Sequence, residues 1–145
     1  MKLISPAFKD GQTIPAAYTC DGADRIVPLE IIDVPKNAVS LALVMDDPDA
    51  PMGTWDHWVV WNIPPDTKKI DAQPQGIAGK NSWGRLNYGG PCPPSGTHRY
   101  FFKLYALDAM LDLPAGSNKS SLLQAMKGHI IAEATLMGLY QRRPA

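Results

Sequence analysis

The 145-residue sequence lacks several features that would indicate particular classes of protein. It has no run of about 18 apolar residues, the length that a membrane-spanning helix needs. Lysine and arginine never exceed two in succession, and the 14 basic and 14 acidic residues cancel. Because nucleic-acid binding depends largely on a basic surface that neutralises phosphates, we expect no nucleic-acid partner and no integral membrane segment.

Cysteine is also scarce. Cys20 and Cys92 are too few for a disulfide scaffold. The first residues, Met1–Pro6, lack the apolar segment of a signal peptide. These observations favour the cytoplasm, where we expect both cysteines to be thiols. A bridge between them would require a proximity that the sequence does not reveal.

Proline and glycine, by contrast, are abundant and widely spread, with 14 and 12 residues. Such frequent punctuation is typical of a β-rich domain with many turns and disfavours a helical bundle. The length predicts one domain over residues 1–145. A helix is predicted at Lys119–Lys127 by its capping signals. Strands are predicted at residues 2–8, Leu29–Val34, 39–46, Trp55–Ile63, His98–Asp108 and His129–Tyr140.

One stretch, Val44–Pro64, combines an apolar strand, an acidic turn and an aromatic strand. The first strand must end where Pro48 and Pro51 remove backbone donors, which places Asp47 and Asp49 in the turn. Period-2 alternation predicts that one face of the next strand carries Trp55, His57, Val59, Trp61 and Ile63.

A second stretch, Tyr88–Phe102, is a glycine–proline loop that leads into another strand. His98 and Tyr100 are two residues apart and therefore share a face of that strand. Taken singly, an Asp-Pro turn and a buried histidine are most often structural. Two histidines and two carboxylates beside a phenol and a glycine loop indicate a small-ligand site.

Three chemistries could use these residues. Two histidines and one carboxylate match the composition of a metal site, although no HxH or HExxH spacing is present. Hydrolysis would need Cys92 or Ser95 as the nucleophile, but there is no GxSxG turn. Anion binding fits best, with imidazolium, Tyr hydroxyl and glycine N–H donors, and with the carboxylates holding both histidines protonated.

The segments DPDAP (Asp47–Pro51), WDHW (Trp55–Trp58) and GGPCPPSGTHRYFFKLYALD (Gly89–Asp108) resemble the phosphatidylethanolamine-binding protein family. The resemblance is to its prokaryotic branch, the Raf kinase inhibitor-like proteins, and it extends from Tyr18 to Glu133. It implies a mainly β fold in which a large antiparallel sheet packs on a smaller one. We expect one or two short helices near the C-terminus, including the helix predicted above.

The resemblance also implies a function. Such a protein binds small anions, such as phosphate or a phosphoethanolamine head group, without catalysis and without a cofactor. It could modulate a kinase or inhibit a serine protease, and it is expected to form a homodimer. A hydrolytic or metal-dependent enzyme remains the alternative. The ligand-binding residues implied by the resemblance are Asp47, Asp49, Trp55, His57, Gly90, Pro91, His98 and Tyr100.

Some positions depart from the family pattern. Trp83 and Asn87 replace a more usual Phe and Gly, and the turn Asp24–Pro28 lacks one proline of the usual motif. The long irregular segment 66–88 is expected to cover one rim of the site. The resemblance further implies a cis peptide bond between Gly53 and Thr54.

Overall fold

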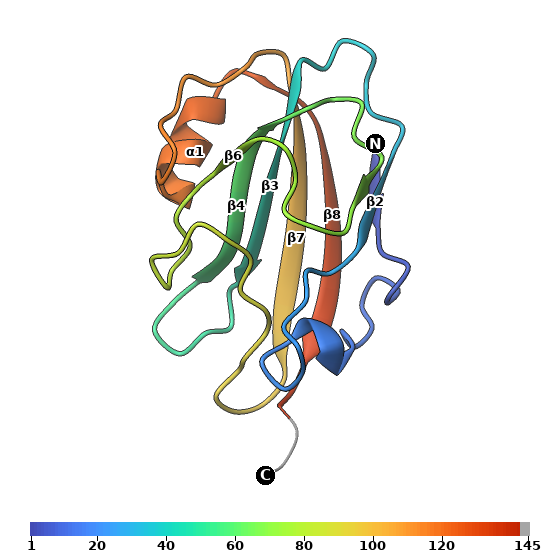
Figure 1. Cartoon of the computed structure of the whole chain (residues 1–145), viewed down its shortest axis with the longest axis vertical. Coiled ribbons are helices and arrows are strands. Elements are labelled where there is room, and N and C mark those ends of the chain that lie inside the picture. Colours follow the sequence, from blue (N-terminus) through green and yellow to red (C-terminus); the bar gives the residue numbers. More distant parts are fainter. Residues whose placement is uncertain (143–145) are drawn as a thin grey trace.

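The computed structural model describes residues 1–142 as two antiparallel sheets that enclose a common core (Figure 1). The small sheet has the order β1-β2-β5, with β1 at Lys2–Ile4, β2 at Leu29–Ile32 and β5 at Lys69–Ile70. The large sheet has the order β6-β4-β3-β7-β8, formed by Ile77–Ala78, Trp55–Ile63, Ser40–Asp47, His98–Leu107 and Ile130–Tyr140. The predicted architecture of a large sheet against a smaller one is confirmed.

Strand β3 is the most deeply buried element, because both faces of the large sheet are covered at its centre. Every residue of Ser40–Asp47 is buried. On one face, Leu43 and Met45 pack in the core shared with the small sheet, whereas Val44 points to the opposite side. This double burial explains why the sequence of β3 is an unbroken apolar run instead of an alternating one.

The opposite face of the large sheet is covered by the helix α1, Lys119–Met126. Asn118 caps it by accepting a hydrogen bond from the Ser121 N–H at 2.9 Å, and Gly128 follows its end with a φ of 81°. The helix predicted from these capping residues is confirmed. A short 3-10 helix, η1 at Ala16–Tyr18, lies near the N-terminus and was not expected.

Strand β4 departs from simple alternation at two bulges. Met45 pairs with Trp58 and Asp46 with Asp56, so His57 is an extra residue on its strand. A second irregularity lies near Asn62, whose φ is 54°. The prediction that five alternating residues of this strand share one face was therefore wrong. Val59 and Trp61 lie on the side of the helix. The side of the shared core carries Trp55, His57, Trp58, Val60 and Ile63.

The loops that follow β3 and precede β7 lie at one end of the large sheet, together with η1, at the bottom of Figure 1. In this region the chain bends at Gly53, which has a φ of 105°. No peptide bond within residues 1–142 is cis, so the expected cis bond at Gly53–Thr54 is wrong. The left-handed conformation open to glycine makes the bend with a trans bond. None of the helices in that range is long and apolar enough to span a bilayer.

Candidate functional site

A cavity of about 260 Å³ lies at the loop-bearing end of the large sheet. Antiparallel pairing brings its polar residues together, because Asp47 at the end of β3 pairs with Trp55 at the start of β4. On the other side of β3, strand β7 begins at the same edge. The complete lining is Asp47, Ala50, Pro51, Trp55, His57, Trp83, Cys92, Pro93, Pro94, His98 and Tyr100.

Asp47 and His98 form a buried pair in the cavity wall. His98 Nδ1 lies 2.7 Å from Asp47 Oδ2, and the side chains are 8% and 4% exposed. The other carboxylate oxygen accepts the Asp49 N–H at 2.8 Å. With both of its oxygens engaged, Asp47 fixes the imidazole ring and leaves Nε2 as the nitrogen available to a ligand.

His57 is oriented by the backbone and not by a carboxylate. Its Nδ1 lies 2.7 Å from the Gly89 carbonyl oxygen, which can only accept, so Nδ1 carries the proton. Burial lowers the pKa of His57, although the Gly89 carbonyl and nearby carboxylates act in the opposite direction. His98 has the expected carboxylate partner, Asp47. The expectation that a carboxylate holds His57 protonated is wrong, because its partner is a backbone carbonyl and the ring is neutral near neutral pH.

Two buried donors in the cavity wall have no hydrogen-bond partner among the described residues: the Tyr100 hydroxyl and the Trp55 Nε1–H. Tyr100 is 0% exposed, and burial together with the nearby Asp47 carboxylate raises its pKa, so the hydroxyl keeps its proton. Asp47 and the Cys92 backbone are its polar neighbours, but neither forms a hydrogen bond of acceptable geometry with it. Unsatisfied buried donors are uncommon and each costs about 1–3 kcal/mol.

Three residues that the family resemblance implies for the site do not line the cavity: Asp49, Gly90 and Pro91. Asp49 is held at the rim by Arg99, whose Nε and Nη2 lie 2.9 and 2.8 Å from its two oxygens. These hydrogen bonds lower the pKa of Asp49 to about 2. Asp49 therefore acts on the site through its N–H, which supports Asp47.

The N–H groups of Gly89 and Gly90 are engaged within the chain. The Gly90 N–H donates to Asp24 Oδ1 at 2.9 Å, and the Gly89 N–H donates to the His57 carbonyl at 3.1 Å. The expectation that glycine N–H groups face a ligand is thus wrong for these two residues. Asp24, in the turn that departs from the family pattern, supplies the carboxylate that takes up the Gly90 donor.

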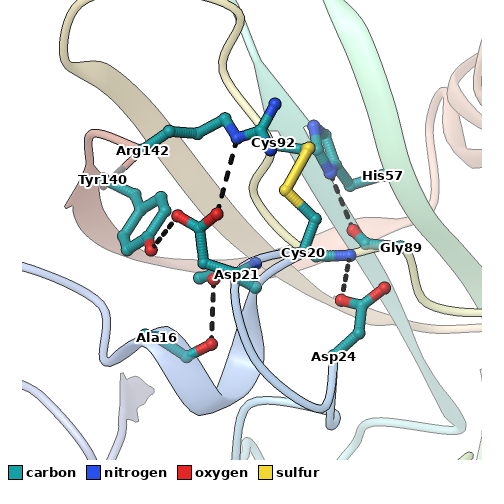
Figure 2. The surroundings of a disulfide bond; sticks show 11 residues. Ala16, Cys20, Asp21, Asp24, His57, Gly89, Cys92, Tyr140 and Arg142 are labelled. Carbon is teal, nitrogen blue, oxygen red and sulfur yellow. Dashed lines mark hydrogen bonds and ion pairs between the residues drawn. A yellow bond between two sulfur atoms is a disulfide. The ribbon is translucent and has the colours of Figure 1, made fainter. Parts of the chain in front are cut away.

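Cys20 and Cys92 are joined by a disulfide with an S–S distance of 2.12 Å, so the expectation of two thiols is wrong (Figure 2). The two loops are also linked by backbone, since the Cys20 N–H donates to the Pro91 carbonyl at 3.1 Å. The cysteines are 72 residues apart in sequence, and only the tertiary structure brings them together. The bridge ties the loop after η1 to the wall of the cavity, beside the hydrogen bond of His57 to Gly89.

Trp83 is a lining residue that the sequence analysis did not include in the site. Its ring stands edge-on to His57 at 4.9 Å and to Trp55 at 5.6 Å between centroids. A Cβ at Gly89 would overlap the Trp83 ring, so the glycine makes room for it. The segment 66–88 covers one rim through this residue, as predicted. The sequence signal that could have identified Trp83 as a site residue was an aromatic side chain among the glycines of an irregular segment.

The arrangement gives little support to the enzymatic alternatives. The described part of the chain has no group of three His, Cys, Asp or Glu side chains placed to hold a metal ion. The Cys92 sulfur is in the disulfide, and Ser95 is exposed and outside the lining of the cavity. Cys92 lies near the histidines of the cavity but has no free thiol, and Ser95 does not share the cavity with them.

Comparisons with known proteins agree with the fold. Residues 4–141 match the family model described as phosphatidylethanolamine-binding protein. A protein of Methanothermobacter thermautotrophicus, named only a UPF0098 protein, is 51% identical over 150 residues, which cover 98% of this chain and 99% of that protein.

Two solved structures are also similar. A protein of Chlamydia trachomatis described as a homologue of the phosphatidylethanolamine-binding protein has a TM-score of 0.95 and 44% identity, over 98% of this chain and 97% of its own. YbcL of Escherichia coli has a TM-score of 0.89 and 28% identity, over 98% of each chain. The chain belongs to the phosphatidylethanolamine-binding protein family, within its prokaryotic branch.

Proposed function

We propose that this chain binds a small phosphate-type anion in the cavity, free or as a phosphoethanolamine-type head group, and carries out no chemistry on it. The observation that carries the proposal is that two residues lining the cavity, Trp55 and Tyr100, each have a buried donor without a partner among the described residues. An apolar ligand would leave both unsatisfied, whereas the oxygens of a phosphoryl group would accept from both.

The Asp47–His98 pair supports the same assignment. His98 Nε2 is the free nitrogen of a ring whose orientation is set by Asp47 at 2.7 Å. In the imidazolium form it donates to a bound anion, and its charge offsets that of the neighbouring carboxylate. The free nitrogen of His98 then joins the two neutral donors of Trp55 and Tyr100 around the ligand.

The size of the cavity limits the ligand. Its volume, about 260 Å³, is at or below the lower end of ordinary small-molecule sites, about 300–1,000 Å³. It suits a phosphoryl group with a short substituent, and the acyl chains of a lipid would have to remain outside.

The rim supports a further step, in which the protein modulates a protein partner such as a kinase. Met52 on one side of the cavity is 95% exposed, and Trp83 and Leu86 on the segment that forms another rim are also exposed. Exposed apolar side chains beside a ligand cavity suit a surface whose partner contact depends on the bound anion.

The test is calorimetric titration with inorganic phosphate and with O-phosphoethanolamine, using wild type, His98→Gln and His129→Gln. His129 is a matched control, because its Nδ1 also pairs with a carboxylate, Asp108, at 2.8 Å but on the exposed surface outside the cavity lining. We expect His98→Gln to weaken binding about ten-fold or more and His129→Gln to leave it unchanged. No binding to wild type, or equal losses in both variants, would contradict the proposal.

A second candidate, inhibition of a serine protease, is favoured by one observation. Met52 projects from the exposed turn after β3, as a side chain must to enter a protease specificity pocket. If this is correct, a chymotrypsin-like protease is inhibited by wild type and not by Met52→Asp, while phosphate binding is retained. Equal inhibition by both proteins would dismiss the role of this turn.

A further inference from the structure

We infer that His57 makes the cavity selective for anions that carry a proton of their own. The cavity would then take inorganic phosphate and phosphate monoesters, and discriminate against sulfate and phosphodiesters. The inference rests on the proposed function, since it concerns the specificity of the same cavity. It starts from an uncharged acceptor in the lining, the His57 ring, which lies beside the donors of Trp55 and Tyr100.

The acceptor follows from the geometry of His57. Because the Gly89 carbonyl at 2.7 Å holds the proton on Nδ1, the second ring nitrogen, Nε2, presents a lone pair. The ring is buried and packed edge-on against Trp83 and Tyr100, at 4.9 and 5.2 Å between centroids. This packing prevents the ring from turning to exchange its two nitrogens without displacing its neighbours.

The charged groups around His57 are all engaged with other partners. Asp47 on β3 is held by His98 of β7, and Asp56 on β4 is paired with Lys119 at 2.6 Å. Asp24, in the loop after η1, accepts the Gly90 N–H. Tyr100 on β7 contributes only a neutral hydroxyl. These carboxylates favour the charged imidazole, but burial outweighs them and lowers the pKa of His57.

A neutral Nε2 distinguishes ligands by their protons. A phosphate monoester retains one ionisable proton up to about pH 6, and its P–OH can donate to Nε2 while its other oxygens accept from Trp55 and Tyr100. Sulfate near neutral pH and a phosphodiester have no such proton. They would place an oxygen lone pair against the lone pair of His57, which leaves two buried acceptors without a donor.

The same chemistry separates two sources of phosphoryl ligand. The phosphate of an intact membrane lipid is a diester, whereas inorganic phosphate and free phosphorylated head groups are not. His57 therefore favours the free compounds over the intact lipid.

The experiment is titration of wild type at about pH 6 with inorganic phosphate, methyl phosphate, sulfate and dimethyl phosphate. We expect the first two to bind about ten-fold or more tightly than the last two, because a site built around a hydrogen bond rejects an analogue that lacks it. Dimethyl phosphate stands for the lipid diester and methyl phosphate for a free head group.

Two variants locate the discrimination. His57→Gln presents an amide that can donate or accept. The ratio of the affinity for sulfate to the affinity for phosphate should therefore rise several-fold in this variant. Tyr100→Phe removes a donor that every one of these anions would use, so it should weaken all of them and leave their ratios unchanged. A second measurement needs no variant: titration in buffers of different ionisation enthalpy should show more proton uptake with sulfate than with inorganic phosphate, which already carries ionisable protons at this pH.

The outcomes separate the two proposals. If none of the four anions binds, the proposed function fails and the inference fails with it. If all four bind equally, the cavity is an anion site and the inference about His57 is overturned. Unchanged ratios in His57→Gln, or equal proton uptake with sulfate and phosphate, would also overturn it.

Discussion

Replacing Tyr100 by Phe should affect folding and ligand binding in opposite directions. The change removes one oxygen atom and keeps the ring, which is fully buried and belongs to the core between the two sheets. That oxygen has no hydrogen-bond partner among the described residues. In the ligand-free protein, Tyr100→Phe therefore removes a buried polar group and no hydrogen bond of acceptable geometry.

The magnitude follows from the cost of an unsatisfied buried hydroxyl, about 1–3 kcal/mol. Relief of this cost should raise the free energy of unfolding of ligand-free Tyr100→Phe by up to that amount. Binding should lose the hydrogen bond that the hydroxyl makes to the anion. A bond from a neutral donor to a charged acceptor contributes about 1.5–3 kcal/mol, so the dissociation constant for phosphate should rise about ten-fold to a hundred-fold.

The assay pairs thermal unfolding without ligand with calorimetric titration of phosphate. Tyr88→Phe is the matched control, because Tyr88 is also a buried tyrosine but its hydroxyl donates to the Tyr18 carbonyl at 2.8 Å and it does not line the cavity. Removing that hydroxyl should lower the melting temperature. Phosphate affinity should stay close to that of wild type.

The reasoning would be refuted if Tyr100→Phe lowered the melting temperature as much as Tyr88→Phe does. That result would mean that the Tyr100 hydroxyl has a partner in the ligand-free protein. Unchanged phosphate affinity in Tyr100→Phe would refute the second half, because the hydroxyl would then not contact the anion.

Three further predictions follow from other contacts of the site. Reducing the Cys20–Cys92 disulfide should lower stability by about 4 kcal/mol, the chain-entropy value for a loop of this length, and an unchanged melting temperature with two free thiols would contradict it. Asp49→Asn should lower the melting temperature at pH 7. The difference in melting temperature should vanish as pH falls from about 5 to 2. The ion pair lowers the pKa of Asp49 in the folded state, so the unfolded chain takes up the proton first. A constant difference over this pH range would argue against the pair. Gly89→Ala should displace the Trp83 ring and change tryptophan fluorescence and phosphate affinity together, and no change in either would mean that the ring does not depend on the glycine.

The long strands and the helix were largely predictable from the sequence because their signals are local, whereas the arrangement in two sheets was implied by the family resemblance. Alternation along His98–Leu107 and Ile130–Tyr140 predicted strands with ends within a residue of those observed. The capping side chain of Asn118 and the glycine at 128 located the helix. Each of these signals acts over a few residues and therefore survives in the sequence.

The grouping of Asp47, Trp55, His57, His98 and Tyr100 around one cavity was also anticipated. The resemblance to the family supplied this set. The antiparallel order of β4, β3 and β7 explains it physically, because that order brings one end of each strand to the same edge.

What the tertiary structure decided depends on contacts between distant residues. The bulge in β4 places His57 on the same side as Trp58, against the simple alternation, because β3 sets the pairing register. The disulfide joins residues 72 positions apart, and Asp24 accepts the Gly90 N–H across 66 positions. No local pattern encodes such distances.

The hydrogen-bond partners of the two histidines show the same division most clearly. The sequence by itself determined that two imidazoles and a carboxylate occur in strands that can meet. Only the folded chain decided that His98 bonds to Asp47, whereas His57 bonds to the Gly89 carbonyl in a buried setting. The physical reason is that burial and hydrogen-bond partners, which set the charge of an imidazole, are properties of its three-dimensional surroundings.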